Sequence, residues 1–219
     1  DIISAFIKSM RGSDPDASVY WLARMIEGGE DVKFIARRML ILAAEDIGLA
    51  NPNALLLAQS TFDAVHKIGY PEARIILSQC AIYLATSAKS NSAYSAIDEA
   101  LALVKATGDL PVPLHIRNAP TKLMKELDYG KNYRYAHNEP EAYAAGEKYF
   151  PDNLDPIEFY KPTTRGLESK ILEKMNYLKS QRDKNQEPNF QTKMREQQES
   201  KPGHLLTNWQ IVAIPYLQF

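Results

Sequence analysis

The chain has a single cysteine, Cys80, among its 219 residues, and it lacks a long hydrophobic run. One cysteine excludes an intramolecular disulfide and favours a reducing compartment. The longest apolar runs, such as residues 39–44 and 54–58, are far shorter than the ~20 residues of a membrane span. No secretory signal pattern precedes them. We therefore expect a cytoplasmic protein with no membrane partner.

Motifs for phosphate and metal binding are also absent from the sequence. There is neither a G-x-x-x-x-G-K-[ST] motif nor a G-x-G-x-x-G motif after a strand, so we expect no ATP binding or hydrolysis by this chain alone. None of the four histidines, which are His66, His115, His137 and His204, lies beside a cysteine or at a two-histidine helical spacing. A zinc site is not expected. The sequence predicts no catalytic, cofactor-binding or metal-binding residue.

The balance of charges restricts the partners. A formal net charge of -1 argues against nucleic-acid binding by bulk electrostatics, although it leaves room for a local basic patch. Apolar residues make up 45% and charged residues 24%, as in ordinary globular proteins. The sequence begins at Asp1, directly in a helical pattern, and we expect it to be part of a longer protein.

The first 107 residues have the pattern of successive helices. Apolar residues recur at helical spacing, and glycines end most of the runs. The runs cover residues 19–26, 32–43, 51–69, 71–89 and 90–108. Asn51 is expected to cap the third run, and Pro71 to occupy the first turn of the fourth. Helices of this length joined by short turns predict an all-α bundle or array over residues 1–110.

Asp14-Pro15-Asp16 could be an acidic site or the start of a helix. Asp14 suits an N-cap, Pro15 the first helical position, and Asp16 the positive end of the helix dipole. A divalent metal would need further oxygen ligands, and none follows at a calcium-loop spacing. We therefore predict a helix start.

Glu45 and Asp46 lie at the end of a predicted helix, where negative charge opposes the helix dipole. These carboxylates are therefore expected to have cationic partners. Arg37 and Arg38, one to two turns earlier, are the predicted partners. A catalytic carboxylate pair remains an alternative.

From residue 111 the pattern becomes irregular. Prolines and tyrosines are frequent in residues 111–162, where only residues 121–127 have the pattern of a short helix. A closing helix is predicted over 163–180 and belongs to the same domain. The tail, residues 181–219, is polar and predicted to be flexible as far as residue 200. Its apolar end could dock on the domain or form a short strand.

Residues 114–137 combine cations with tyrosines. Such a mixture could bind a single-stranded nucleic acid or an acidic peptide. In the simpler interpretation, the tyrosines anchor an irregular loop and the cations are solvated or paired within it. The candidate binding residues are Arg117, Lys122, Lys125, Tyr129, Lys131, Tyr133 and Arg134.

Several stretches closely resemble the C-terminal part of the bacterial RarA/MgsA AAA+ ATPases, a family with a eukaryotic relative, the Werner-helicase-interacting ATPase. The resemblance covers about residues 1–180 in unbroken order and does not extend to the tail. The stretches are SMRGSDPDASVYWLARMIEGGED, ARRMLILAAEDIGLANP, IYLATSAKSNSAY, PVPLHIRNAPTKLMKELDYGKNYRYAH and YKPTTRGLESKI.

The resemblance implies a helical domain related to the clamp-loader collar, in which residues 1–110 form an oligomerisation core. It also implies a homotetramer and a nucleoid-associated, DNA-stimulated ATPase that acts at stalled replication forks, with links to DNA and single-strand-binding protein. ATP and Mg²⁺ would bind a part that this sequence lacks. Matching residues that are expected to determine fold or interfaces are Asp14, Trp21, Arg24, Arg37, Asp46, Asn91, Asn118 and Arg165, together with Arg117 and Lys122.

Overall fold

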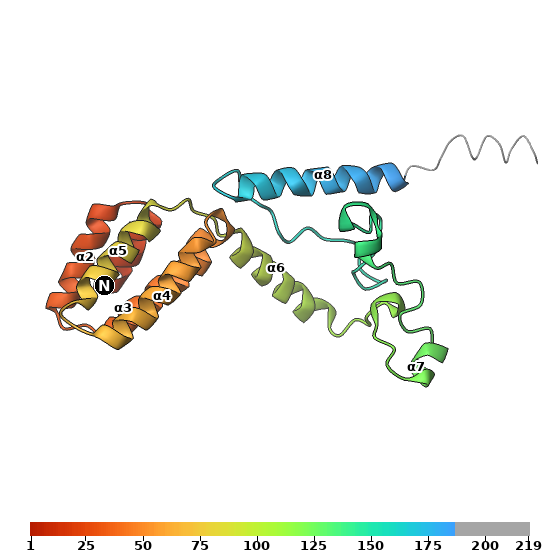
Figure 1. Cartoon of the computed structure of the whole chain (residues 1–219), viewed down its shortest axis with the longest axis horizontal. Coiled ribbons are helices and arrows are strands. Elements are labelled where there is room, and N and C mark those ends of the chain that lie inside the picture. Colours follow the sequence, from red (N-terminus) through yellow and green to blue (C-terminus); the bar gives the residue numbers. More distant parts are fainter. Residues whose placement is uncertain (187–219) are drawn as a thin grey trace, which may run out of the picture.

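A computed structural model describes residues 1–186, and these residues form helices, turns and loops without a strand. This confirms the predicted all-α class. The N-terminal half is a bundle, drawn in red to yellow in Figure 1. Its helices are α1 (Ile2–Arg11), α2 (Pro15–Glu27), α3 (Val32–Leu42), α4 (Asn53–Ile68) and α5 (Ala73–Thr86).

The core of the bundle follows from helical spacing. Residues four apart share one face of a helix, so Phe6 and Met10 on α1, and Ile35 and Met39 on α3, point into the same interior. Cys80 is buried there, and its burial raises the pKa of the thiol to about 11. A thiol with a raised pKa is a poor nucleophile, which agrees with a structural role.

The start of α2 confirms the predicted helix cap. A side-chain oxygen of Asp14 accepts a hydrogen bond from the backbone N–H of Ala17 at 2.9 Å, and Pro15 is the first helical residue. The Asp14-Pro15-Asp16 stretch therefore begins a helix.

Replacing the cap should have a measurable cost. We expect Asp14→Ala to lower the free energy of unfolding by about 1 kcal/mol, because the N–H of Ala17 loses its acceptor. Asp14→Asn is the control, since an asparagine side chain also caps. Urea unfolding followed by circular dichroism measures both; equal losses in the two variants would contradict the capping role.

Two predicted helix starts are wrong. α4 begins at Asn53 after Pro52, and the side-chain amide of Asn51 instead donates to the hydroxyls of Tyr83 at 3.0 Å and Ser87 at 3.1 Å. Asn51 therefore joins two parts of the bundle, a long-range role that local spacing does not reveal. Pro71 precedes α5, which begins at Ala73.

The link between α3 and α4 changes helix type. α3 continues into a π-helical turn, η1 (Ala43–Ile47), and then into a 3-10 turn, η2 (Gly48–Ala50). The backbone N–H of Ser90 donates to the carbonyl of Asp46 at 2.8 Å. These turns thus bind the loop that leads into α6 (Ser92–Thr107).

Two helices project from this end of the bundle. α6 and α8 (Glu168–Gln186) both begin beside it and run away from it (Figure 1). Residues 108–167 form an irregular extension that leads from the far end of α6 back to the start of α8. The short elements of the extension are η3 (Leu114–Ile116), α7 (Lys122–Glu126), η4 (Ala136–Asn138) and η5 (Pro140–Ala142).

The short predicted helix is present as α7, and the Thr121 hydroxyl caps it by accepting from the N–H of Met124 at 3.2 Å. The closing helix is α8, and it runs beyond the predicted residue 180 to Gln186. Residues 181–186 are therefore helical, which corrects the predicted start of the tail. The expectations for the remainder of the tail lie outside the described residues.

Candidate functional site

A buried carboxylate joins the starts of the two projecting helices beside the bundle. Glu168, the first residue of α8, is 0% exposed. Its Oε2 accepts from the hydroxyl of Ser90 at 2.7 Å, and from both the backbone N–H and the hydroxyl of Thr163 at 2.8 Å. The Ser92 hydroxyl lies 3.3 Å from the same oxygen, and Tyr160 donates to Oε1 at 3.1 Å.

These hydrogen bonds keep the carboxylate ionised. Burial by itself raises the pKa of Glu168, but the bonds from the Thr163 backbone, Ser90, the Thr163 hydroxyl and Tyr160 outweigh it. The pKa of Glu168 therefore lies below its ordinary value, because each donor favours the charged form. Local sequence patterns carry no signal for this residue, since its donors lie 5 to 78 positions away.

The residues before Glu168 fit closely against the bundle. The backbone N–H of Leu167 donates to the carbonyl of Ala50 at 2.8 Å, and Arg165 Nε donates to the carbonyl of Lys89 at 2.6 Å. Gly166 has a φ of +54°, and a Cβ there would lie 2.1 Å from the Ala50 oxygen. We call residues 163–168, with Glu168 at their end, the docking segment.

The predicted partners of the helix-end carboxylates are wrong. Arg11, on α1, donates from Nε to Asp46 at 2.7 Å, and its terminal nitrogen lies 3.7 Å from Glu45. No ion pair of Arg37 or Arg38 occurs within the described part of the chain. The bundle brings α1 to the end of α3, and this tertiary contact replaces the local pairing.

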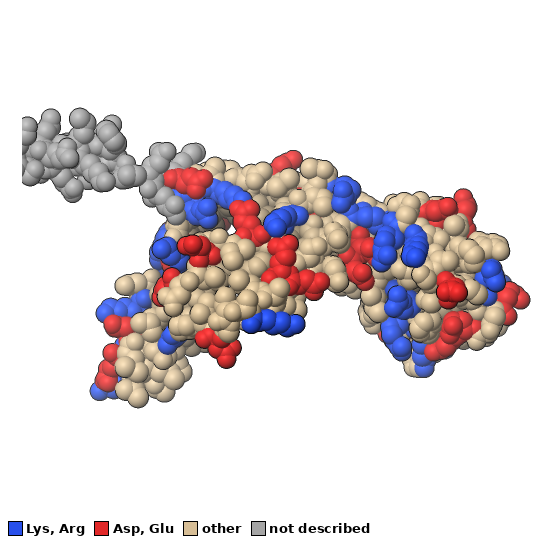
Figure 2. Space-filling view, turned by 180° about the vertical axis from the view of Figure 1, so that it is seen from behind, with Lys and Arg blue, Asp and Glu red and all other residues tan. Residues whose placement is uncertain are grey.

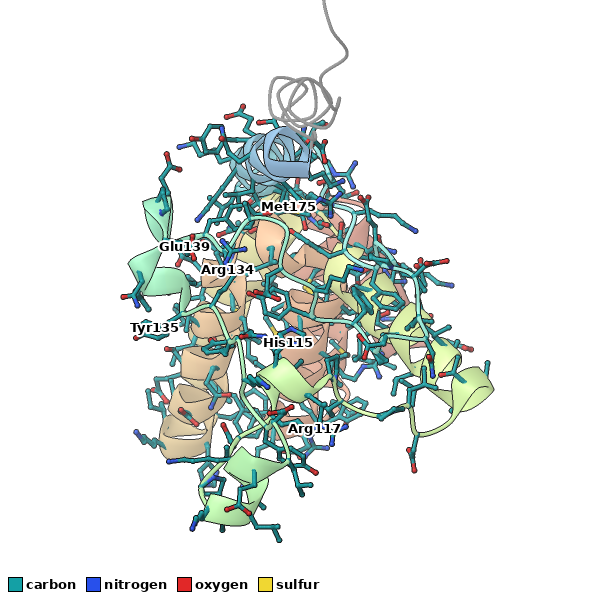
Figure 3. The ribbon with its side chains drawn as sticks, turned by 90° about the vertical axis from the view of Figure 1, so that its right-hand side faces the viewer. His115, Arg117, Arg134, Tyr135, Glu139 and Met175 are labelled. Atoms are coloured by element: carbon teal, nitrogen blue, oxygen red, sulfur yellow. The ribbon has the colours of Figure 1, made fainter. Side chains whose placement is uncertain are left out.

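The two arginines of the basic Tyr-rich segment, residues 114–137, hold their own loop. Arg117 Nε donates to the Val112 carbonyl at 2.6 Å, and its guanidinium lies 5.0 Å from the centre of the Tyr129 ring. Arg134 forms a two-pronged ion pair with Glu139, beside which it lies in Figure 3, and also donates to the Ala145 carbonyl at 2.8 Å.

The lysines of this segment lie at the surface. Lys122 is 3.8 Å from Glu126, and Lys131 is 2.9 Å from Asp128. Such exposed pairs contribute little to stability, but they reduce the local positive charge. Within residues 1–183, Lys125 has no ion pair, and Tyr133 is exposed. Nucleic-acid binding by this segment stays a prediction.

Charges of both signs are interspersed over the face drawn in Figure 2, with uncharged surface between them. A nucleic-acid site that depends on phosphate contacts needs a row of cations along one face. The face in Figure 2 therefore offers no broad basic surface.

The other residues that match the family stretches have structural or surface positions. Arg24 lies over the Trp21 ring at 5.4 Å on α2, which fixes two neighbouring side chains. Asn91 precedes α6 without a side-chain capping bond. Arg37 and Asn118 are exposed. These positions do not converge on one site.

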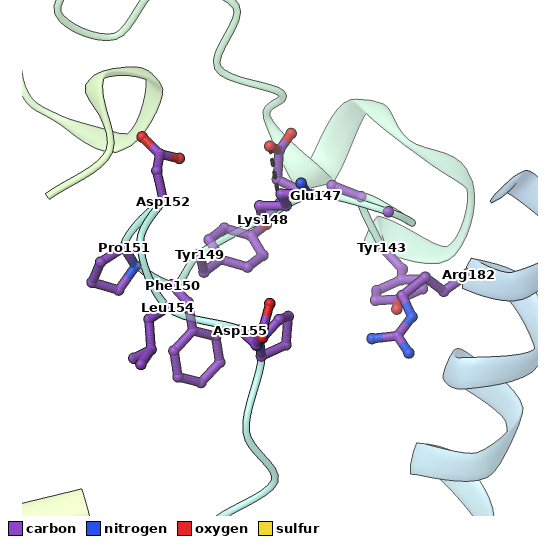
Figure 4. Close-up of a pocket in the computed structure, with 13 residues that line it drawn as sticks. Tyr143, Glu147, Lys148, Tyr149, Phe150, Pro151, Asp152, Leu154, Asp155 and Arg182 are labelled. Atoms are coloured by element: carbon purple, nitrogen blue, oxygen red, sulfur yellow. Dashed lines mark hydrogen bonds between the residues drawn. The ribbon is translucent and has the colours of Figure 1, made fainter. Parts of the chain in front are cut away.

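A pocket lies between the extension and α8. It has a volume of about 530 Å³, and its walls include the rings of Tyr143, Tyr149 and Phe150. Arg182 reaches from α8 toward Tyr143, and Asp155 lies across the pocket in Figure 4. Rings with charges of both signs can hold a polar ligand, but the lining residues give no arrangement of a nucleophile beside a base.

An apolar stripe on α6 is exposed. Tyr94, Ile97, Leu101 and Val104 are between 48% and 57% exposed. Their spacing of three, four and three residues places them on one face of the helix, as in the seam of a coiled coil. α6 meets the bundle mainly at η1 and η2, so most of its length has no bundle helix beside it.

Two features are absent from the residues that the structure describes. No group of three or more metal-binding side chains is found among them. No helix in this part of the chain has the length and apolarity needed to cross a membrane.

The bundle and its extension define a helical domain of the class that accompanies AAA+ ATPase cores, because residues 12–179 match the family described as the MgsA AAA+ ATPase C terminal. The chain belongs to this family. It is 51% identical over 179 residues to the replication-associated recombination protein A of Coxiella burnetii and 50% identical over 181 residues to that of Escherichia coli K12. The family resemblance inferred from the sequence is thereby confirmed.

The matches cover most of this chain and a minority of each relative. They span 82% of this chain and 41% of the Coxiella protein, and 83% of this chain and 40% of the Escherichia protein. The ATPase WRNIP1 of Dictyostelium discoideum is 42% identical over 74% of this chain and 18% of its own length. The chain thus spans about two fifths of the length of its bacterial relatives.

Proposed function

We propose that this chain is the self-assembly domain of a longer AAA+ ATPase that acts in replication-associated recombination and repair. The names of the bacterial relatives support the process, and the matched family supports the link to an ATPase. The chain itself performs no catalysis in this proposal. ATP and Mg²⁺ bind the remainder of the longer protein, which also makes the contacts with DNA and single-strand-binding protein, in the cytoplasm at the nucleoid.

The exposed stripe on α6 is the observation that carries the assembly proposal. Four half-exposed side chains of this size present on the order of 400 Å² per copy. A stable interface buries about 800 Å² per partner, so further apolar surface has to take part. The extension supplies it through Val112, Leu114, Leu123, Leu127 and Tyr133, which are all exposed.

We propose four copies, following the family resemblance, in a closed symmetric arrangement. Closed symmetry is the usual form of homo-oligomers, and it covers the same apolar face on every copy. The stripe then packs against another copy, which removes its side chains from water.

Light scattering on a sizing column tests the assembly. The chain has a mass of 24.7 kDa, and we expect the wild type to elute with about four times this mass. Leu101→Asp should shift the protein to monomers or dimers at the same concentration, because a charge would be buried in the apolar seam. Ala102→Asp places the same charge beside the stripe on the exposed surface of α6 and should leave the mass unchanged.

A wild-type monomer at high concentration would contradict the proposal. In that outcome the basic Tyr-rich segment becomes the better candidate, as a nucleic-acid or partner site. Its binding to single-stranded DNA should then weaken steeply with salt. Charge reversal at Lys122, Lys125 and Lys131 should abolish that binding.

A further inference from the structure

Besides the basic Tyr-rich segment, a second group of cations lines a groove between α1 and α3 in the bundle. A pocket of about 250 Å³ is lined there by Lys8 and Arg11 from α1 and by Arg38 from α3. Its apolar walls are Ile3 and Ile7, also from α1, together with Phe34 from α3.

Helical spacing explains why these side chains meet. Residues four apart are neighbours on a helix surface, so Ile3 and Ile7 form one row while Phe34 and Arg38 form the facing row. The eight residue-to-residue steps from Ile3 to Arg11 span about 12 Å of helix axis. An extended peptide of about four residues covers this length.

The three cations of the pocket differ in whether a carboxylate neutralises them. Arg11 is held by Asp46 at 2.7 Å and by Glu45 at 3.7 Å. Within the described part of the chain, Lys8 and Arg38 have no ion pair. The Nε atom of Arg38 is buried and has no hydrogen-bond acceptor. Buried donors are almost always paired, so Arg38 is poorly compensated at its Nε–H as well as in its charge.

The walls of the pocket discriminate between anionic ligands. A nucleic-acid backbone requires a series of phosphate contacts, whereas only two uncompensated cations lie here, beside apolar side chains. Ile7 is buried, and Ile3 and Phe34 are half-buried. A ligand with a carboxylate beside an apolar group matches both the cations and the apolar walls of this pocket.

We propose that the α1–α3 pocket binds an acidic peptide segment of a partner protein. One carboxylate accepts hydrogen bonds from Arg38 and Lys8, and a neighbouring apolar side chain packs on Ile3, Ile7 and Phe34. This site is separate from the α6 stripe, and its occupancy does not depend on the proposed assembly.

Fluorescence anisotropy with the full 219-residue chain tests the proposal. The probe is a labelled hexapeptide of alternating Glu and Leu, and we expect saturable binding. Arg38→Gln should weaken binding at least tenfold, because a charge-assisted hydrogen bond is lost. Arg37→Gln removes an adjacent, exposed arginine outside the pocket and should change affinity less than twofold. Lys8→Gln, at an exposed position, should also weaken binding without affecting the fold.

Two comparison probes separate the alternatives. A hexapeptide of alternating Glu and Ser should bind at least fivefold more weakly, since it lacks the apolar group. Equal binding of that peptide, equal weakening by Arg37→Gln, or no saturable binding of the Glu/Leu peptide would overturn the proposal. Arg38-dependent binding of single-stranded DNA in preference to the peptide would likewise overturn it, in favour of a nucleic-acid site.

Discussion

Gly166→Ala is expected to release the docking segment from the bundle. The added Cβ would lie 2.1 Å from the carbonyl oxygen and 2.9 Å from the carbonyl carbon of Ala50. Both are backbone atoms, which cannot move aside as a flexible side chain can. The φ of +54° adds a cost of about 1–2 kcal/mol for any residue with a Cβ. We expect a total loss of about 3 kcal/mol or more in the docking of this segment.

Amide hydrogen exchange at Leu167 measures this loss directly, because its N–H donates to Ala50. A loss of about 3 kcal/mol corresponds to exchange that is roughly 100-fold faster. Gly108→Ala is the matched control: Gly108 also has a positive φ, of +68°, but no atom lies within 4 Å of the position that a Cβ would take there. It should cost about 1–2 kcal/mol and leave the exchange rate of Leu167 unchanged. Similar exchange rates in both variants would show that the contact with Ala50 is not needed.

Removal of the buried carboxylate should have a comparable effect. Glu168→Ala leaves the hydroxyls of Ser90 and Tyr160 and the N–H of Thr163 without their acceptor. Leaving buried donors without an ionised acceptor costs free energy. We therefore expect the docking of residues 163–168 on the bundle to be weakened by about 3 kcal/mol. Glu168→Gln keeps one oxygen acceptor and the side-chain shape, so it should lose about half as much. Leu167 exchange again provides the measurement.

The stability of the docked segment should fall at acidic pH, because it depends on the ionised form of Glu168. The pKa of Glu168 in the folded protein is lower than its ordinary value of 4.5. The carboxylate therefore stabilises docking fully above pH 4.5, and this contribution is lost as the pH falls through the folded pKa. The difference between wild type and Glu168→Gln should be constant near neutral pH and shrink below about pH 4. A difference that persists unchanged at a pH of about 2 would assign the effect to packing instead of charge.

The sequence was sufficient to predict most helices of residues 1–107, although the starts of α4 and α5 were wrong. Apolar residues at helical spacing predicted α2 to α6, and Asp14-Pro15 predicted the start of α2, because these signals depend on neighbours within about one turn. The short helix α7 was predicted for the same reason. The family stretches added the class of protein, which spacing alone does not contain.

The long-range contacts could not be predicted from local patterns. Asn51 has the pattern of a cap, but its side chain hydrogen-bonds to Tyr83 on α5. Glu45 and Asp46, which were predicted to pair with Arg37 and Arg38, pair with Arg11 instead. Glu168 has no distinguishing pattern within the predicted closing helix, yet the fold surrounds it with donors. In each example the partner is chosen by how helices pack together, which is a property of the tertiary structure.

Because α6 and α8 both begin at the docking segment, the geometry of this segment sets the direction of α6. Sixteen residues of α6 extend about 24 Å, so a rotation of about 5° at its first turn displaces the far end by about 2 Å. The extension is attached to that end and would be displaced with it. A small change in the geometry around Glu168 would therefore become a larger displacement at the far end of α6.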